Sequence, residues 1–345
     1  MTRQILVGDV KIGGGAPVSI QSMLNTLTTD VEGSLRQIRA LAAAGCQIAR
    51  LAVPDRAAAA GFAEIAEESP LPLVADIHFD HRLALLAAEG GAKKIRINPG
   101  NIGDAGKVRE VADACRERGI PIRVGVNGGS LEKPLLEKYG HPTAEALVES
   151  AFGHLELLEQ CGFYDLCVSM KSSSVPTTMA AYRLFAQRSD YPLHLGVTET
   201  GSVYMGTVKS AMGIGGLLCL GIGDTLRVSL TADPVEEVRA AKAILKAAGL
   251  RREGVNLISC PTCGRTKIDL IGLVRQVEEA LQDCEKPITV AVMGCVVNGP
   301  GEAREADVGI AGGDGVGLLF AKGELIRKYP YDELLPALLQ YIETL

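Results

Sequence analysis

The sequence predicts an α/β protein in which a closed (β/α)8 barrel of the TIM type precedes a smaller α+β domain. Strand-like apolar runs alternate with amphipathic helical segments through roughly the first 250 residues, and this alternation is typical of a parallel α/β fold. Eight such units in about 250 residues fit a closed barrel. The pattern changes at a polar connection that begins at Arg251. We therefore expect two domains, residues 1–250 and residues 251–345.

A short hairpin precedes the barrel, because the apolar runs Ile5–Val7 and Val10–Ile12 flank a glycine turn. The eight predicted barrel strands are residues 18–23, 47–53, 73–78, 94–98, 122–126, 166–171, 194–198 and 225–230. An open doubly wound sheet is the alternative arrangement of such units. It is disfavoured, because the string Gly213-Ile214-Gly215 falls inside a predicted helix and lacks the context of a dinucleotide-binding loop.

Amphipathic segments separate the strands, and two of the predicted helix starts carry capping signals. One apolar stripe at helical spacing consists of Leu147, Ala151, Leu155 and Leu158. Thr29 and Glu32 have the spacing of a capping box. Asp233, Pro234 and Glu236 combine an N-cap, a first-turn proline and a glutamate that reaches back. These signals predict helices that begin near residues 30 and 234.

The second domain is predicted to mix strands and helices. A strand precedes Cys260, a helix covers about residues 269–282, and another strand precedes Cys295. Two short strands, residues 308–311 and 317–321, are joined by a glycine-rich turn that indicates a hairpin. A final helix is expected over about residues 331–344.

Composition excludes several classes of protein. A hydrophobic content of 47% with 22% charged residues is typical of a soluble protein with a large core, and a net charge of −6 argues against a nucleic-acid partner. The longest apolar stretch, near residues 213–222, is far shorter than the ~18 to 20 residues of a membrane span. Nine cysteines, an odd number, fit a reducing compartment, so we expect a cytoplasmic protein without a membrane partner.

Three cysteines near the C-terminus indicate a metal centre. Cys260 and Cys263 form a C-x-x-C pair in a turn that contains proline and glycine, and Cys295 follows an apolar run over residues 288–292. Thiolates select zinc or iron–sulfur clusters, but a structural zinc site normally has a fourth Cys or His ligand. All five histidines lie at position 194 or before. The sequence therefore favours iron with an open or oxygen-ligated position, with a zinc staple or a redox disulfide as alternatives.

Five predicted barrel strands each carry one cation near their ends. These residues are Arg50, Arg96, Arg123, Lys171 and Arg227. Each alone could pair with a carboxylate in the barrel wall. Together they favour one shared anionic ligand, because a buried unpaired cation costs several kcal/mol. Arginine's planar fork suits phosphate oxygens, and ligands bind at the C-terminal face of a barrel. We therefore predict a phosphate-bearing ligand at that face.

Asp76, His78 and Glu199 end two further strands and are candidates for acid–base chemistry. Glu199 is the residue that we favour, although it could equally serve as a counter-ion of the cations, and His78 could be a polar residue of the wall. His154 lies on the apolar stripe of a helix and is expected to be a buried structural histidine.

The cysteine motifs, C-P-T-C-G-R and M-G-C-V-V-N-G-P-G-E, resemble those of the 4-hydroxy-3-methylbut-2-enyl diphosphate synthase family. The barrel motifs D-I-H-F-D, K-I-R-I-N-P-G-N, R-V-G-V-N-G-G-S, S-M-K-S-S and G-D-T-L-R-V-S-L extend the resemblance over nearly the whole chain. It implies a four-iron four-sulfur cluster held by Cys260, Cys263, Cys295 and Glu302. It also implies that the substrate diphosphate is held by Arg50, Arg96, Arg123, Asn127, Lys171, Arg227 and Ser229. We add Asp76, His78 and Asn298 as candidate substrate-binding residues, and Glu199 and Glu302 as candidate catalytic residues.

The resemblance implies an oxidoreductase of the non-mevalonate pathway of isoprene biosynthesis. The reaction would be the reductive ring-opening dehydration of 2-C-methyl-D-erythritol 2,4-cyclodiphosphate, with flavodoxin or ferredoxin as electron donor. Two other hypotheses are a pterin-dependent barrel enzyme with a zinc-stapled appendix and a non-enzymatic iron–sulfur redox sensor. The chain departs from the commonest family pattern at Leu24, Leu27 and Thr200, and we expect these side chains to contact none of the proposed ligands.

The connection between the domains predicts a dimer. Barrel helices run back from the mouth, so the last one ends on the opposite face. A linker of residues 250–256 spans at most about 25 Å, which is too short for an easy route to the same chain's barrel mouth. A head-to-tail homodimer, which the resemblance also implies, would place each cluster domain over the partner's barrel.

Overall fold

The computed structural model describes residues 1–282, 284–295, 303–313 and 315–345. The chain divides into two compact units, Met1–Arg251 and Arg252–Leu345. Each unit has its own hydrophobic core, and each is described separately below.

The first unit is a closed parallel barrel, as the sequence predicts. Its strands are β3 (Ser19–Met23), β4 (Ile48–Ala52), β5 (Leu73–Asp76), β6 (Lys94–Ile97), β7 (Ile122–Asn127), β8 (Leu166–Lys171), β9 (His194–Leu195) and β10 (Thr225–Leu226). Neighbours follow the order β8-β7-β6-β5-β4-β3-β10-β9, and a parallel bridge between Val168 and Leu193 closes the ring. The carboxyl ends of all eight strands therefore meet at one mouth.

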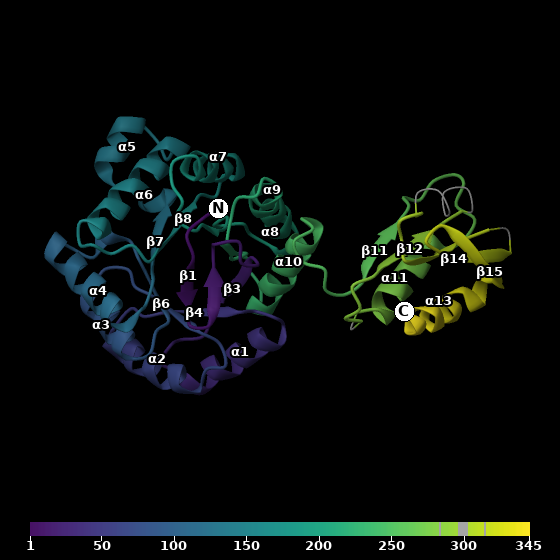
Figure 1. Cartoon of the computed structure of the whole chain (residues 1–345), viewed down its shortest axis with the longest axis horizontal. Helices are drawn as coiled ribbons and strands as arrows, with labels where there is room; N and C mark the ends of the chain where they lie inside the picture. Colours follow the sequence, from purple (N-terminus) through teal and green to yellow (C-terminus); the bar gives the residue numbers. More distant parts are fainter. Residues whose placement is uncertain (283, 296–302, 314) are drawn as a thin grey trace. The chain divides into compact units, whose positions relative to one another are not determined.

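Ten α-helices of this unit surround the strands (Figure 1). They are α1 (Val31–Ala43), α2 (Arg56–Glu68), α3 (His81–Glu89), α4 (Ala105–Arg118), α5 (Lys133–Tyr139), α6 (Ala144–Glu159), α7 (Val175–Ala186), α8 (Val203–Ser210), α9 (Gly216–Cys219) and α10 (Pro234–Ala247). The predicted stripe on α6 is fully buried, because it packs on the outward faces of the strands. Gly213 and Gly215 lie in a π-helical turn between α8 and α9, so they form no nucleotide-binding loop.

The predicted capping box at Thr29 is wrong by one residue. Asp30 is the N-cap of α1, and its side chain accepts a hydrogen bond from the backbone N–H of Gly33. A Cβ atom at position 33 would lie 2.1 Å from the Asp30 carboxylate, so glycine permits this cap. At α10 the predicted N-cap Asp233 is correct, whereas the Glu236 carboxylate pairs with Arg239.

The N-terminal hairpin closes the lower end of the barrel. Strands β1 (Ile5–Val7) and β2 (Val10–Ile12) pair antiparallel, as predicted. Ile5, Val7 and Ile12 are buried against Ile48, Val74 and Cys167, which lie near the starts of three barrel strands. The hairpin is therefore an apolar plug at the end opposite the mouth.

The second unit is a five-stranded mixed sheet with helices on one face (Figure 1). Its elements are β11 (Asn256–Ser259), α11 (Leu270–Ala280), β12 (Thr289–Met293), β13 (Val308–Ala311), β14 (Val316–Ala321), β15 (Glu324–Pro330) and α13 (Leu334–Thr344). Strands β11, β12 and β13 are parallel, and β14 and β15 continue the sheet antiparallel. The sequence prediction omitted β15. The two helices share one core with the sheet.

Within the described residues, no helix is both long enough and apolar enough to cross a membrane.

Candidate functional site

Side chains of opposite charge converge inside the barrel near its mouth. The predicted strand-end cations Arg50, Arg96, Arg123 and Lys171 are each at most 8% exposed, and Arg227 is half-buried. Their strand partners show that they share the inward face, since Arg96 lies beside both Asp76 and Arg123 in the sheet. The structure therefore brings these cations together.

Asp76 is the carboxylate at the centre of this cluster. Arg96 Nη1 donates to Asp76 Oδ1 at 3.2 Å, and Arg50 Nε lies 3.8 Å from Oδ2. His78 Nε2 lies 3.6 Å from the same oxygen, although the His78 side chain is about half exposed. Burial alone would raise the pKa of Asp76, but Arg50, His78 and Arg96 outweigh burial and hold that pKa far below its usual value. Asp76 is therefore a fixed anion rather than a proton donor.

Two glycines make room for the long cationic side chains. A Cβ atom at Gly125 on β7 would lie 2.5 Å from Arg96 Nε. A Cβ atom at Gly196, which follows β9, would lie 2.6 Å from Lys171 Nζ. Because such approaches are too close for real Cβ atoms, glycine at these positions lets the two cations lie across the barrel interior. The glycines in the sequences R-V-G-V-N (residues 123–127) and H-L-G-V-T (residues 194–198) thus have a steric explanation.

Glu237 on α10 is a site residue that the sequence analysis missed. Its carboxylate accepts from Arg227 Nη2 at 2.9 Å and from Arg227 Nε at 3.2 Å, a two-point contact that fixes the guanidinium plane. It also accepts from Ser22 Oγ and from the backbone N–H of Leu230. Glu237 is 3% exposed, and its position beside Val238 on the buried stripe of α10 was the available signal.

Asn127 and Ser229 complete the polar rim. Arg227 Nη1 donates to Ser229 Oγ at 2.6 Å. When the Asn127 amide is oriented to satisfy both of its groups, its oxygen accepts from Arg96 Nη2 at 3.2 Å. The Thr200 hydroxyl donates to the backbone oxygen of Ser229. The expectation that Thr200 contacts no proposed ligand residue is therefore wrong, because this bond ties the loop after β9 to the segment that follows β10.

The cations are strongly coupled to one another. Burial, and then the neighbouring cations, lower the pKa of Lys171 well below its ordinary value. Burial likewise lowers the pKa of Arg50 and of Arg123. Asp76 and Glu237 are the carboxylates that contact this set, so positive charge exceeds negative charge among the side chains described here. Such an excess favours an anionic ligand.

Glu199 lies in the loop after β9 and is exposed. Its φ angle is +54°, a left-handed conformation that residues with a Cβ atom rarely adopt. Strained backbone of this kind is held in place by surrounding contacts and clusters at functional sites. The bond from the Thr200 hydroxyl to the backbone oxygen of Ser229 is one such contact.

His154 is buried on α6, as expected, and contacts Glu132 in the segment before α5. His154 Nε2 lies 2.6 Å from Glu132 Oε1, and Ser150 Oγ donates to the same oxygen at 3.0 Å. Burial would raise the pKa of Glu132, but the contacts with His154 and Ser150 outweigh it and lower the pKa to about 2. His154 also packs on Gly100, so it supports the loops that follow β6 and β7.

The predicted cysteine ligands lie on two adjacent loops of the second unit. Cys260 directly follows β11, and Cys295 follows β12, its parallel neighbour. The backbone N–H of Gly294 donates to Cys260 Sγ at 3.2 Å. Thr266 Oγ1 accepts from the Cys263 backbone N–H, and the N–H of Lys267 donates to the Gly294 oxygen. The two loops are thus joined at the edge where both strands end.

Among the described residues, no three Cys, His, Asp or Glu side chains converge tightly enough to hold a single metal ion. The cysteines nevertheless fit a group larger than one ion, such as an iron–sulfur cluster. They lie on two loops at the carboxyl ends of the adjacent strands β11 and β12, and the backbone N–H of Gly294 donates to one of the sulfurs. Glu302 and Asn298 lie outside the described residues.

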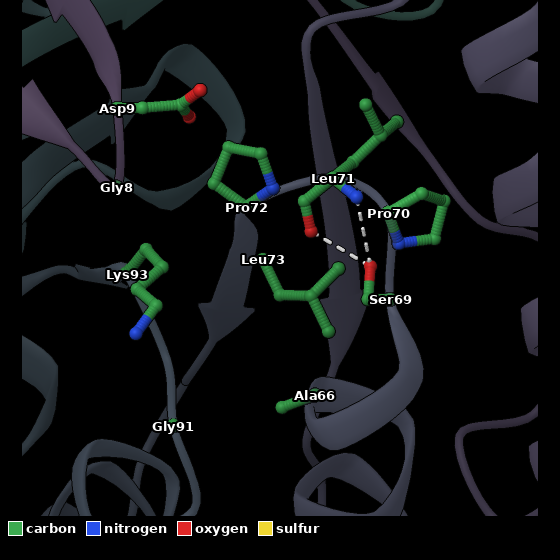
Figure 2. A pocket seen from close by; sticks show the side chains of 10 residues that line it. All are labelled: Gly8, Asp9, Ala66, Ser69, Pro70, Leu71, Pro72, Leu73, Gly91 and Lys93. Carbon is green, nitrogen blue, oxygen red and sulfur yellow. Dashed lines mark hydrogen bonds between the residues drawn. The ribbon is translucent and has the colours of Figure 1, made fainter.

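Two surface pockets lie away from these sites. One, of about 290 Å³, is lined by residues of the loops before β5 and β6 and by the hairpin turn, so it opens on the end of the barrel opposite the mouth (Figure 2). Lys93 and Asp9 flank it, and Ser69 is occupied by hydrogen bonds with Leu71. The other, of about 630 Å³, is lined in part by Asp190 and Asp224. Neither pocket contains a predicted site residue.

Comparisons with known proteins cover both units. The GcpE TIM-barrel domain matches residues 2–242, and the GcpE protein C-terminal domain matches residues 256–344. A protein of Geobacter sulfurreducens named 4-hydroxy-3-methylbut-2-en-1-yl diphosphate synthase (flavodoxin) is 61% identical over 100% of this chain and 98% of its own length. A protein of the same name from Clostridium perfringens is 58% identical over 100% of this chain and 99% of its own length.

Among solved structures, a truncated 3-deoxy-D-arabino-heptulosonate 7-phosphate synthase from Thermotoga maritima is similar to this chain, with a TM-score of 0.51 and 14% identity. The match covers 72% of this chain and 94% of that structure, and at this identity it shows the barrel fold alone.

Proposed function

The chain belongs to the GcpE family, whose relatives named above are 4-hydroxy-3-methylbut-2-en-1-yl diphosphate synthases, and we propose that it catalyses the reaction of that name. The reaction is the reductive ring opening and dehydration of 2-C-methyl-D-erythritol 2,4-cyclodiphosphate in the non-mevalonate pathway. Two electrons are taken up, a ring C–O bond breaks, and one oxygen leaves as water. Family membership gives no support to a pterin enzyme with a zinc appendix or to a redox sensor.

The observation that carries this proposal is the convergence of cations inside the barrel mouth. Arg50, Arg96, Arg123 and Lys171 come from four strands and Arg227 directly follows β10. The described carboxylates in contact with these cations are Asp76 and Glu237. A cyclic diphosphate carries two negative charges, and it would offset the excess of positive charge. Arginine forks bind phosphate oxygens in two-point contacts. Asn127 and Ser229 would add neutral contacts at the rim, with His78 and Asn298 as further candidates.

Asp76 and Glu237 would act by orientation. Each carboxylate holds one or two arginine side chains, so the guanidinium planes are fixed before the ligand arrives. Pre-orientation of this kind reduces the entropy that the side chains lose on binding. We assign Asp76 to the substrate site on this basis.

Glu199 is our candidate for proton transfer. It stands at the mouth on a strained loop, exposed to an incoming ligand. Its carboxyl oxygen would hold the proton that the departing oxygen needs to leave as water, or it would stabilise positive charge that develops on the carbon skeleton.

Cys260, Cys263 and Cys295, with Glu302 as an oxygen ligand, would hold a four-iron four-sulfur cluster. When bound, such a cluster supplies single electrons and an iron position that can exchange an oxygen ligand, and no amino-acid side chain is a comparable reductant. The chain's own part is to hold the sulfurs through the joined loops at Gly294. The printed names of the relatives include flavodoxin, so we assign flavodoxin rather than ferredoxin as the electron donor.

We further propose a head-to-tail homodimer in which one chain's cluster loops cover the partner's barrel mouth. Large apolar side chains are exposed on loops that follow the carboxyl ends of barrel strands and at the start of α8. They are Leu27 at 76%, Phe79 at 74% and Tyr204 at 77%. Exposed apolar groups at a mouth favour a covering partner.

The test is anaerobic purification followed by determination of iron, sulfide and zinc and by an assay with the cyclic diphosphate and reduced flavodoxin. We expect about four irons per chain with matching sulfide, together with turnover. Replacement of Cys260, Cys263 or Cys295 by Ser should remove the cluster. Colourless protein with stoichiometric zinc would refute the iron–sulfur proposal, and an iron–sulfur protein without turnover would favour the redox sensor.

A further inference from the structure

The barrel interior below the mouth is polar where barrels are usually filled by branched apolar side chains. Lys94 on β6 is fully buried, and its neighbour in the sheet is Val74, which packs on the N-terminal hairpin. Lys94 therefore lies between the apolar plug and the cations of the mouth. No role in binding or catalysis has been given to it above.

Lys94 Nζ has no hydrogen-bond partner among the described protein atoms. The same is true of both ring nitrogens of His194, both amide atoms of Gln21, and Nε and Nη1 of Arg123. An unsatisfied buried polar group is destabilising, and a charged one is more so. A lysine that stays permanently charged here would be costly, whereas one that can release its proton reduces the cost.

The groups that face Lys94 are mostly cationic or neutral. They are Arg50 on β4, Arg123 on β7, Cys167 on β8 and His194 on β9. Burial lowers the pKa of Lys94 most, Cys167 opposes this shift, Arg123 and Arg50 lower the pKa further, and the net value is about 7. Burial and the surrounding cations also lower the pKa of His194 well below its ordinary value, so His194 is neutral.

We propose that Lys94 takes up a proton when the anionic substrate enters the barrel mouth, so that the cation cluster gains one positive charge on binding. This inference rests on the proposed function, because the diphosphate supplies the negative charge. Two negative charges beside Arg50 and Arg123 would oppose the repulsion that these cations exert on the Lys94 ammonium. Lys94 acts through them and is a positioning residue.

The substrate itself does not exchange a proton near neutral pH. Each phosphorus of a cyclic diphosphate has one ionisable oxygen, which is strongly acidic, so both charges are already present. Any proton that accompanies binding must therefore go to the protein or come from it. Since the complex would bind more protons than the free protein, the affinity should fall as the pH rises above about 7.

The experiment is titration calorimetry of the anaerobic full-length protein with the cyclic diphosphate, without reductant, in two buffers of different ionisation enthalpy at about pH 8. Three proteins are compared: wild type, Lys94→Met and Lys93→Met. Lys93 is the matched control, because it is the adjacent residue but is exposed and lines the pocket on the opposite end of the barrel (Figure 2).

We expect wild type and Lys93→Met to take up the same number of protons, and Lys94→Met to take up about one fewer. Above neutrality the substrate affinity should fall with rising pH more steeply in wild type than in Lys94→Met. The two proteins should differ by up to about tenfold in affinity for each pH unit. A second variant, Lys94→Arg, keeps the charge at all pH values and should also lose this proton. It serves as the test if the methionine variant does not fold.

Equal proton uptake by wild type and by a folded Lys94 variant would overturn the role of Lys94 while leaving the diphosphate site intact. In that case the proton would belong to Lys171 or His194, which also face the cations. Absence of substrate binding by wild type would overturn the proposed function, and the role of Lys94 with it.

Discussion

Glu199 combines exposure at the mouth with a left-handed backbone, and its substitution separates catalysis from binding. Glu199→Gln keeps the shape and the φ angle but cannot hold a transferable proton on a carboxyl oxygen. We expect the turnover number to fall at least about 100-fold, because general acid–base groups contribute about 10² to 10⁴. The dissociation constant of the substrate, measured by calorimetry, should change little. An equal loss in affinity and turnover would instead identify Glu199 as a binding residue.

Lys171 is expected to bind the ground-state diphosphate. Lys171→Met removes one amine donor from the cluster and should weaken substrate binding by roughly 1.5 to 3 kcal/mol, the range for a hydrogen bond to a charged group such as the diphosphate. Calorimetry measures the difference directly. The control is Lys138→Met, since Lys138 is an exposed lysine paired with Glu149 outside the barrel. Unchanged affinity in Lys171→Met would place the anion site elsewhere.

At the scale of residues, the sequence predicted the strand-end cations because a charge inside an apolar run stands out. It did not predict roles for Lys94, Gln21 or His194. Both faces of a barrel strand are buried, so the hydrophobic pattern does not distinguish side chains that point into the barrel from side chains that face the helices. Glu237 was missed for a related reason. A glutamate in a helix is usually exposed, and only the contact with Arg227 shows otherwise.

The element formed by α5, α6 and the loop after β6 depends on the buried contact between Glu132 and His154. Since the pKa of Glu132 is lowered from 4.5 to about 2 in the folded chain, its stabilising effect is present above about pH 4.5 and is lost as the pH falls towards 2. Denaturant unfolding of wild type and Glu132→Gln at about pH 5 and pH 3 tests this.

Wild type should lose more unfolding free energy over this interval than Glu132→Gln, by about 1 kcal/mol after allowance for solvent screening. The control is Glu156→Gln. Glu156 is an exposed residue of α6, the helix that carries His154, so this variant should behave as wild type. Parallel losses in all three proteins would show that the contact contributes nothing to acid stability.

Elements with strong periodicity were predicted well, and elements defined by pairing were not. The predicted residues 166–171 and 308–311 are β8 and β13 as observed. The last two barrel strands are only two residues long, so Gly196 and Ser229 lie in the segments that follow them. Strand β15 was missed since most of its side chains are exposed, so it lacks an apolar face, and pairing with β14 defines it.

For the whole molecule, the proposed head-to-tail homodimer makes a quantitative prediction about mixed subunits. Glu199→Gln changes a residue at the barrel mouth, and Cys295→Ser changes a residue of the cluster loops. Each variant alone should therefore be inactive. In a mixed dimer one site would collect both defects and the other none. Subunit exchange at equal ratio should therefore restore roughly a quarter of wild-type activity. A mixture that remains inactive would show that each site is built within one chain.

The hairpin that plugs the barrel also imposes an order on events during synthesis. Its residues leave the ribosome before the barrel strands do, but Ile5, Val7 and Ile12 pack on Cys167, roughly 150 residues later in the chain. At a synthesis rate of roughly 5 to 20 residues per second, the residues that cover this apolar segment are made on the order of ten seconds after it. A protease added to stalled nascent chains should cut the hairpin until β8 has emerged and spare it afterwards. Protection of the hairpin from the protease before β8 has emerged would mean that another surface, such as a chaperone, covers its apolar side chains while the barrel is still incomplete.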